Sequence, residues 1–163
     1  MKVVSIALCA MLPVAALAEG PALQTPAPVL YLADNLDEPD ALGYCLDTVG
    51  RGLSDRAHLH SCKPRGGDVQ FMHDDQGQIK SATFDDLCLD VSEGFALTRC
   101  TGGAGQVFTW SDTAELRLAS APDLCLASAP ESRRAGPFVA RDLVLADCET
   151  TPIDLKTWAY LSE

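Results

Sequence analysis

Two histidines, His58 and His60, alternate with Ala57 and Leu59 in one short segment. Successive side chains of a β-strand point to opposite faces, so a strand here would place both imidazoles on the same face. Imidazole nitrogens are ligands that zinc and copper favour, and Asp47 could add a carboxylate oxygen as a third ligand. Two solvated histidines on an outer face are the simpler alternative. These residues alone leave both alternatives open.

The motifs of common catalytic machineries are missing from the sequence. Neither Gly-x-Ser-x-Gly nor His-Glu-x-x-His occurs, and no Cys-x-x-Cys pair suggests redox chemistry. A glycine-rich stretch, Gly102-Gly103-Ala104-Gly105, precedes an apolar run typical of a strand, whereas a phosphate-binding glycine loop opens a helix. We therefore predict that the chain is not an enzyme and takes no cofactor.

The chain of 163 residues carries a formal net charge of −11. Phosphate groups are bound by clustered Lys and Arg, so nucleic acid and anionic membrane surfaces are poor partners for this chain. The charge favours solubility, and the length suits a single domain.

The N-terminus has the pattern of a secretory signal peptide. A basic start at Lys2 is followed by an apolar run to Leu17, and Ala16-Leu17-Ala18 supplies the small residues that a signal peptidase recognises. A membrane span needs about 20 apolar residues, and neither this run nor any later one is long enough. We predict a signal peptide at residues 1–18, cleaved before Glu19, no membrane span, and a secreted or periplasmic location.

Residues 19–28 hold three prolines and are predicted to form a short extended linker. From Val29 onward no helical apolar stripe is present. Short apolar runs separated by Gly, Asp, Asn and Pro recur instead, for example at 29–32, 69–72, 106–108 and 143–145. Many short strands with frequent turns are typical of an all-β sandwich or barrel.

The sequence after the linker consists of three copies of one repeat. Residues 77–89 align with residues 114–126 without a gap, and the first cysteines of the three copies are 43 and 37 residues apart. Each copy is long enough for about four strands with their turns. A propeller needs at least four blades, whereas three copies around one axis can close a barrel and share a core. We therefore predict an all-β fold, a β-trefoil of about twelve strands at 29–163, with units at about 29–72, 73–110 and 111–163.

Six cysteines remain after the signal peptide, an even number that fits three disulfides in an oxidising compartment. Six cysteines allow fifteen connectivities, but three equivalent copies favour one local bridge in each. The predicted pairs are Cys45–Cys62, Cys88–Cys100 and Cys125–Cys148.

Two motifs recur, one near the start and one near the end of each copy. The first is Cys45-Leu46-Asp47, Cys88-Leu89-Asp90 and Cys125-Leu126-Ala127, and the second is Gln70-Phe71-Met72, Gln106-Val107-Phe108 and Lys156-Thr157-Trp158. The chain thereby resembles the ricin-type β-trefoil lectins, which are marked by Cys-Leu-Asp and Gln-x-Trp. No Gln-x-Trp is intact, so the threefold recurrence carries the resemblance. We expect the last residue of each triplet, Met72, Phe108 or Trp158, to fill the shared core.

The resemblance implies one shallow sugar site in each copy. In the family, the Asp after Cys-Leu accepts hydrogen bonds from sugar hydroxyls, and an aromatic ring two residues before the second Cys stacks on the sugar. A polar residue four before that Cys and an Asn just before the Gln of the triplet complete the site, and Val69 and Gly105 stand at the Asn positions of the first two copies. The candidate residues implied in this way are Asp47, His58, His60 and Gln70 in the first copy, and Asp90 and Gln106 in the second.

The first copy is the best candidate, because His60 could stack on a sugar while His58 forms a hydrogen bond with it. Thr98 stands where the second copy would need a ring, and Ala127 replaces the Asp of the third copy. We therefore expect weak binding of a glycan or glycoconjugate, centred on the first copy. A domain that binds a protein partner on a trefoil scaffold is the alternative, with the loop around Arg133 as the contact.

Overall fold

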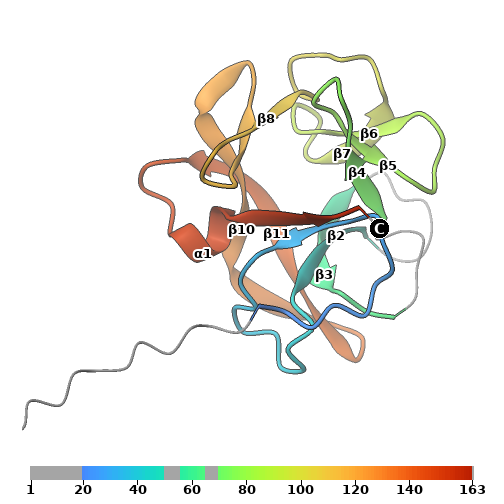
Figure 1. Ribbon diagram of the computed structural model, residues 1–163, viewed down its shortest axis with the longest axis vertical. Coiled ribbons are helices and arrows are strands. Elements are labelled where there is room, and N and C mark those ends of the chain that lie inside the picture. Colours follow the sequence, from blue (N-terminus) through green and yellow to red (C-terminus); the bar gives the residue numbers. More distant parts are fainter. Residues whose placement is uncertain (1–19, 50–55, 65–69, 163) are drawn as a thin grey trace, which may run out of the picture.

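The computed structural model describes residues 20–49, 56–64 and 70–162, and this part of the chain is all-β apart from one short helix (Figure 1). The predicted signal peptide lies outside the described residues. The elements are β1 (Val29–Leu32), β2 (Tyr44–Thr48), β3 (Ala57–Ser61), β4 (Phe71–His73), β5 (Ile79–Ser81), β6 (Leu87–Asp90), β7 (Ala96–Arg99), β8 (Phe108–Trp110), β9 (Leu116–Leu118), β10 (Ala121–Ala135), β11 (Phe138–Asp147), α1 (Ile153–Lys156) and β12 (Trp158–Leu161).

The strands fall into three successive groups of four, which confirms the predicted trefoil. Three antiparallel pairs, β1–β12, β4–β5 and β8–β9, join one unit to the next. The middle strands of each unit form the hairpins β2–β3, β6–β7 and β10–β11. Isolated bridges between Gln78 and Val107 and between Glu115 and Thr157 connect the outer strands within the second and third units. The joined outer strands make the barrel, and the hairpins extend from it.

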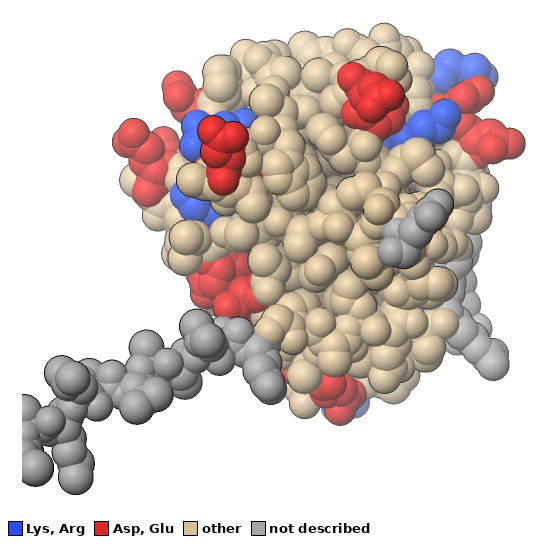
Figure 2. Space-filling view, in the orientation of Figure 1, with Lys and Arg blue, Asp and Glu red and all other residues tan. Residues whose placement is uncertain are grey.

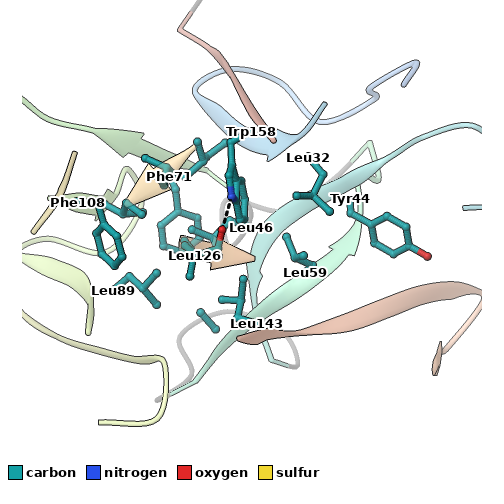
Figure 3. Packing of buried hydrophobic residues seen from close by; sticks show 14 of the residues in the cluster. Leu32, Tyr44, Leu46, Leu59, Phe71, Leu89, Phe108, Leu126, Leu143 and Trp158 are labelled. Carbon is teal, nitrogen blue, oxygen red and sulfur yellow. Dashed lines mark hydrogen bonds between the residues drawn. The ribbon is translucent and has the colours of Figure 1, made fainter. Parts of the chain in front are cut away.

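The core is built from equivalent leucines of the three units (Figure 3). The Leu after each first cysteine, Leu46, Leu89 or Leu126, is completely buried. Each of them faces another leucine across its hairpin, namely Leu59, Leu97 and Leu145 in turn. Burying a leucine side chain contributes about 1.5–3 kcal/mol, so the Cys-Leu motif marks the core as well as the disulfide.

The large residue that fills the core from the first unit is Phe71, and the prediction of Met72 was wrong. Phe71 is completely buried beside Phe108 and Trp158, whereas Met72 is only half-buried (Figure 3). The strand pairing agrees, because Phe71 pairs with Ser81 as Phe108 pairs with Leu118. Neighbouring residues of a strand point to opposite faces, so only one of Phe71 and Met72 can enter the core.

Each unit contains one disulfide, and the three pairs are the predicted ones, Cys45–Cys62, Cys88–Cys100 and Cys125–Cys148. Each bridge links the first strand of a hairpin to the end of the second. The bridged residues are 17, 12 and 23 positions apart. A bridge that closes a loop of this length stabilises the fold by about 3 kcal/mol in the chain-entropy model.

Residues 20–28, predicted to form an extended linker, contain no strand or helix and lie against the first unit. The amide of Gln24 donates to the carbonyl of Cys62, and the Thr25 hydroxyl donates to the carbonyl of Lys63. A Cβ on Gly43 would lie 2.4 Å from Pro21 Cβ, so the segment also packs closely on the turn before β2. The segment is thereby part of the folded domain.

The β10–β11 hairpin is much longer than the other two. Its strands contain 15 and 10 residues, and the register shifts between Ser128 and Ser132. Beyond the shift the hairpin reaches the first unit, where Ala140 pairs with His60 and Arg141 pairs with Leu59 (Figure 1). The third unit thus covers part of the first. No helix in the described ranges is long and apolar enough to cross a membrane.

Candidate functional site

The structure brings Asp47, His58 and His60 of the first unit together, as the alternation of residues predicts. Asp47 pairs directly with His58 across the β2–β3 hairpin, and His60 is two residues further along the same face. This face is enclosed, because Asp47 is fully buried and His58 and His60 are only 4% and 7% exposed. The alternative of two solvated histidines on an outer face was therefore wrong.

Three basic side chains lie within this cluster. Lys63 Nζ is 2.7 Å from Asp47 Oδ2, and His60 Nδ1 is 3.9 Å from the same oxygen. Arg133 Nη2 is 2.9 Å from His58 Nδ1. Burial, followed by the charges of His60 and Arg133, lowers the pKa of His58 to about 3, so this imidazole is neutral at neutral pH.

The β10–β11 hairpin of the third unit forms one wall of the cluster. The Phe138 ring meets the His60 ring edge-on, with 5.6 Å between centroids, and Arg133 is hydrogen-bonded to His58 Nδ1. The metal alternative gains no support from the geometry. The metal-ligand distances among the described residues are met by Glu115, Cys125 and Cys148, and both of those cysteines are in a disulfide.

The equivalent side chains of the second unit lie nearer to solvent. Asp90 is partly exposed, and its Oδ1 accepts hydrogen bonds from the amide and hydroxyl of Ser92 at 3.0 and 2.5 Å. Its Oδ2 accepts from Thr98 Oγ1 at 3.3 Å and Gln106 Nε2 at 3.2 Å. Burial raises the pKa of Asp90, but these hydrogen bonds, led by those from Ser92, outweigh it and lower the pKa below its ordinary value.

Gln106 is almost fully buried and holds this arrangement in place. Its Nε2 also donates to Thr98 Oγ1 at 2.8 Å and to the carbonyl of Arg99 at 2.9 Å. Its Oε1 accepts from the amides of Thr101 and Gly102. A buried amide must have its polar atoms satisfied, and Gln106 satisfies them while orienting Asp90. Ser92 was missed in the sequence, although an Asp followed two residues later by Ser is a common turn pattern.

Gly105 closes one side of Asp90. A Cβ at this position would lie 2.5 Å from Asp90 Oδ1 and 2.8 Å from Ser92 Oγ. We therefore expect Gly105→Ala to displace the carboxylate and to lower the free energy of unfolding by about 1–3 kcal/mol, as overpacking does. Gly103→Ala is the control, because its nearest contact is a hydroxyl 3.3 Å away. Urea denaturation of both variants checks this, and equal stability would contradict it.

The third unit has lost the carboxylate and has a different interaction at the Gln position. Ala127 is the counterpart of Asp47 and Asp90 and is fully buried. Lys156 replaces Gln106, and its ammonium lies 2.8 Å from Glu115 Oε1 and donates to the carbonyl of Cys148. The third unit thus contains a buried ion pair at the place where, in the second unit, Gln78 Nε2 donates to Gln106 Oε1 at 3.3 Å.

Gln70, a predicted site residue, has a different role from Asp47 and His60. Its Nε2 donates to the carbonyls of Pro26 and Ala27, at 3.3 and 2.8 Å, and so holds the N-terminal segment. With Phe71 in the core, Gln70 corresponds to Val107 rather than to Gln106. The Gln106 position falls on Val69 in the first unit, which lies outside the described residues.

The comparisons with known proteins agree with this architecture. The family model described as the ricin-type beta-trefoil lectin domain matches residues 37–151. The chain belongs to this family. A comparison with curated proteins finds no match. Among solved structures, the chain is similar to one titled "Solution structure of mdaA-1 domain", with 16% identity, a TM-score of 0.59, and coverage of 93% of this chain and 98% of the other. At this identity the likeness shows the fold alone.

Membership of the family accounts for the Cys-Leu-Asp motif, the three disulfides and the twelve strands together. Ricin-type domains are carbohydrate-binding modules, and the features that the family shares are kept unevenly in this member. The Asp is enclosed in the first unit, near the surface in the second and absent from the third. The three units therefore differ in how far this position is exposed to solvent.

Proposed function

We propose that this ricin-type domain is a secreted or periplasmic carbohydrate-binding module that binds glycans weakly, with the second unit as its accessible site. The observation that supports this most is the Asp90 carboxylate, which Gln106 and Thr98 hold near the surface. The first unit keeps the better set of residue types, but binding there requires the enclosed face of Asp47 to be uncovered. The three disulfides support export to an oxidising compartment.

Weak affinity follows from the hydrogen bonding of Asp90. A carboxylate has about four acceptor positions, and Asp90 already accepts four hydrogen bonds from its own chain. A sugar hydroxyl must therefore displace one of these donors or bind to the hydroxyls of Ser92 and Thr98. The second unit also lacks an aromatic ring two residues before Cys100, so no stacking adds to the affinity.

The surface supports a neutral ligand better than a polyanionic one. On the face drawn in Figure 2, Lys and Arg side chains lie next to Asp and Glu and form no continuous basic patch. The formal net charge of −11 acts in the same direction. Nucleic acids need such a patch, so a glycan is the more suitable partner.

The test is a glycan array at neutral pH, followed by calorimetric titration of each glycan that binds. We expect Asp90→Asn to reduce the affinity about tenfold or more, since hydrogen bonds to a charged group contribute about 1.5–3 kcal/mol. Glu93→Gln is the matched control, because Glu93 is exposed three residues away. An unchanged affinity in Asp90→Asn would reject the second unit as the site, and a silent array would favour the protein-interaction alternative.

A further inference from the structure

The outer half of the β10–β11 hairpin, residues 133–140, rests on the first unit through its backbone and two side chains. Ala140 pairs with His60 on β3, and the Ser61 hydroxyl hydrogen-bonds with both the backbone N–H and the carbonyl of Val139, each at 3.3 Å. Toward the tip, the side-chain contacts with the cluster are Arg133 on His58 and the edge of Phe138 on His60. The tip residues Gly136 and Pro137 are exposed. Residues 133–140 therefore cover Asp47 and the two histidines from the third unit and end in a tip that faces solvent.

The base of the same hairpin is held much more firmly. The Arg141 guanidinium donates to Asp37 Oδ1 at 2.7 Å and to the carbonyl of Ala129 at 2.8 Å, and it lies over the Tyr44 ring. Burial raises the pKa of Asp37, but hydrogen bonds from Ser132, Tyr44 and Arg141 outweigh it and hold the pKa well below its ordinary value. This anchor stays ionised in mild acid. The register shift between Ser128 and Ser132 separates it from the inner half of the hairpin.

The contact between Arg133 and His58 depends on the protonation of His58. An arginine can only donate, so Nδ1 of His58 must accept and cannot carry a proton. The proton of the neutral imidazole is then on Nε2, which is buried and has no hydrogen-bond partner among the described residues. A second proton, on Nδ1, would remove the hydrogen bond and place an imidazolium 2.9 Å from a guanidinium.

More basic than acidic groups surround His58. The titratable and charged groups near it in the described chain are Asp47 on β2, His60 on β3, Arg56 and Lys63 beside the ends of β3, and Arg133 and Asp142 on the hairpin. Lys63 is already paired with Asp47, and Arg133 with Asp142 at 3.2 Å. Each of the two carboxylates is therefore already paired with a cation. A protonated His58 would have to share one of them.

We propose that the outer half of the β10–β11 hairpin is a lid over the Asp47, His58 and His60 cluster, closed by the Arg133–His58 hydrogen bond and released when His58 is protonated. This inference rests on the proposed function, since the lid would control access of glycans to the first unit. Release would uncover the cluster and add a second binding face to that of the second unit.

The direction of the pH dependence follows from the pKa of His58. Burial and the neighbouring cations lower this pKa from 6.5 to about 3 in the closed state, and an open lid returns it toward 6.5. The open state therefore binds protons more readily, and the closed state loses stability as the pH falls below 6.5. Between about pH 7.4 and about pH 5, the ratio of open to closed lid should rise by up to about 30-fold, the limit reached when opening restores the ordinary pKa of His58.

Amide hydrogen exchange followed by NMR on the mature protein measures the lid directly. After correction for intrinsic exchange rates, we expect protection of the amides of Ala140 and His60 in the β3–β11 ladder to fall by up to about 30-fold at about pH 5. Amides of the β8–β9 ladder, such as Thr109 and Arg117, serve as the internal reference and should keep their protection. Equal protection of the β3–β11 ladder at both pH values would overturn the lid.

Two pairs of variants assign the effect to the proposed latch. His58→Gln removes the titration, so the lid should become insensitive to pH, while His73→Gln, at a histidine outside the cluster, should keep the wild-type response. Arg133→Met removes the latch and should expose the ladder at neutral pH, while Arg134→Met at the exposed neighbouring residue should not. A pH response that persists in His58→Gln would reject His58 as the trigger.

Glycan titration at both pH values separates the lid from the proposed function. If the lid opens but no array glycan binds at either pH value, the proposed function is rejected and the lid is retained. If glycan binding depends on Asp90 but the lid does not respond to pH, the lid is rejected and the proposed function is retained. If both are correct, wild type should gain affinity at about pH 5 and Asp47→Asn should lose only that gain.

Discussion

Glu115→Leu should lower the free energy of unfolding by about 3–5 kcal/mol, because it leaves the Lys156 ammonium buried without its carboxylate. Glu115 and Lys156 are 5% and 9% exposed, and Arg117 also contacts Glu115 at 2.6 Å. Burial raises the pKa of Glu115, but hydrogen bonds from Lys156 and Arg117 outweigh it and lower the pKa to about 2. Urea denaturation of the variant, beside Asp112→Asn at an exposed turn, measures the loss.

The double variant Glu115→Gln/Lys156→Gln copies the amide pair of Gln78 and Gln106 into the third unit. We expect it to regain most of the stability that Glu115→Leu loses, since two amides can satisfy each other without a buried charge. The contribution of Glu115 is present above pH 4.5 and is lost as the pH falls toward 2, so the double variant should also be less sensitive to acid over that range. A double variant as unstable as Glu115→Leu would contradict the equivalence of the two units.

Phe71→Ala should destabilise the protein by about 3–5 kcal/mol, whereas Met72→Ala should cost about 1 kcal/mol or less. Phe71 is completely buried in the shared core between Phe108 and Trp158, and truncation would leave a cavity there (Figure 3). Met72, on the opposite face of β4, is only half-buried. Thermal and urea denaturation of the two variants side by side distinguish them.

Phe108→Ala provides the matched control from the second unit, because Phe108 occupies the equivalent position and is 1% exposed. Its loss of stability should be close to that of Phe71→Ala. A larger loss in Met72→Ala than in Phe71→Ala would mean that the core of the first unit has the register that the Gln-x-Trp motif predicts, and that the pairing of β4 with β5 is one residue out.

The fold was predictable because the features that define it repeat in the sequence. Cys-Leu recurs at the start of every unit, and each of these leucines is in the core while each cysteine bridges to the end of its own hairpin. Period and spacing alone therefore gave three units of four strands. The register of β4 was missed because the motif relies on a polar residue, and the first unit has no polar residue at that position.

The residue on the neighbouring strand also differs between the units. Gln78 and Glu115 are the partners of Gln106 and Lys156, and the buried Val29 holds their position in the first unit. The nearest glutamine, Gln70, instead matched the motif in the sequence, and its amide donates to the N-terminal segment.

The candidate site was predicted only within single units. Alternation placed His58 and His60 on one face with Asp47, and the pairing across β2–β3 agrees. The burial of that face depends on Arg133 and Phe138, which come from another unit about 75 positions along the chain. Such contacts leave no local pattern. The length of the third loop between cysteines, the longest of the three, was the only signal of a hairpin that extends beyond its unit.

The three units therefore share a scaffold and differ in exposure. NMR titration of the wild-type protein at neutral pH with a glycan that binds on the array tests this most directly, because each amide reports on its own unit. We predict shifts in the β6–β7 hairpin around Asp90 and Thr98, and none in the β2–β3 hairpin around Asp47. Shifts confined to β2–β3, or to the third unit around Ala127, would contradict the account.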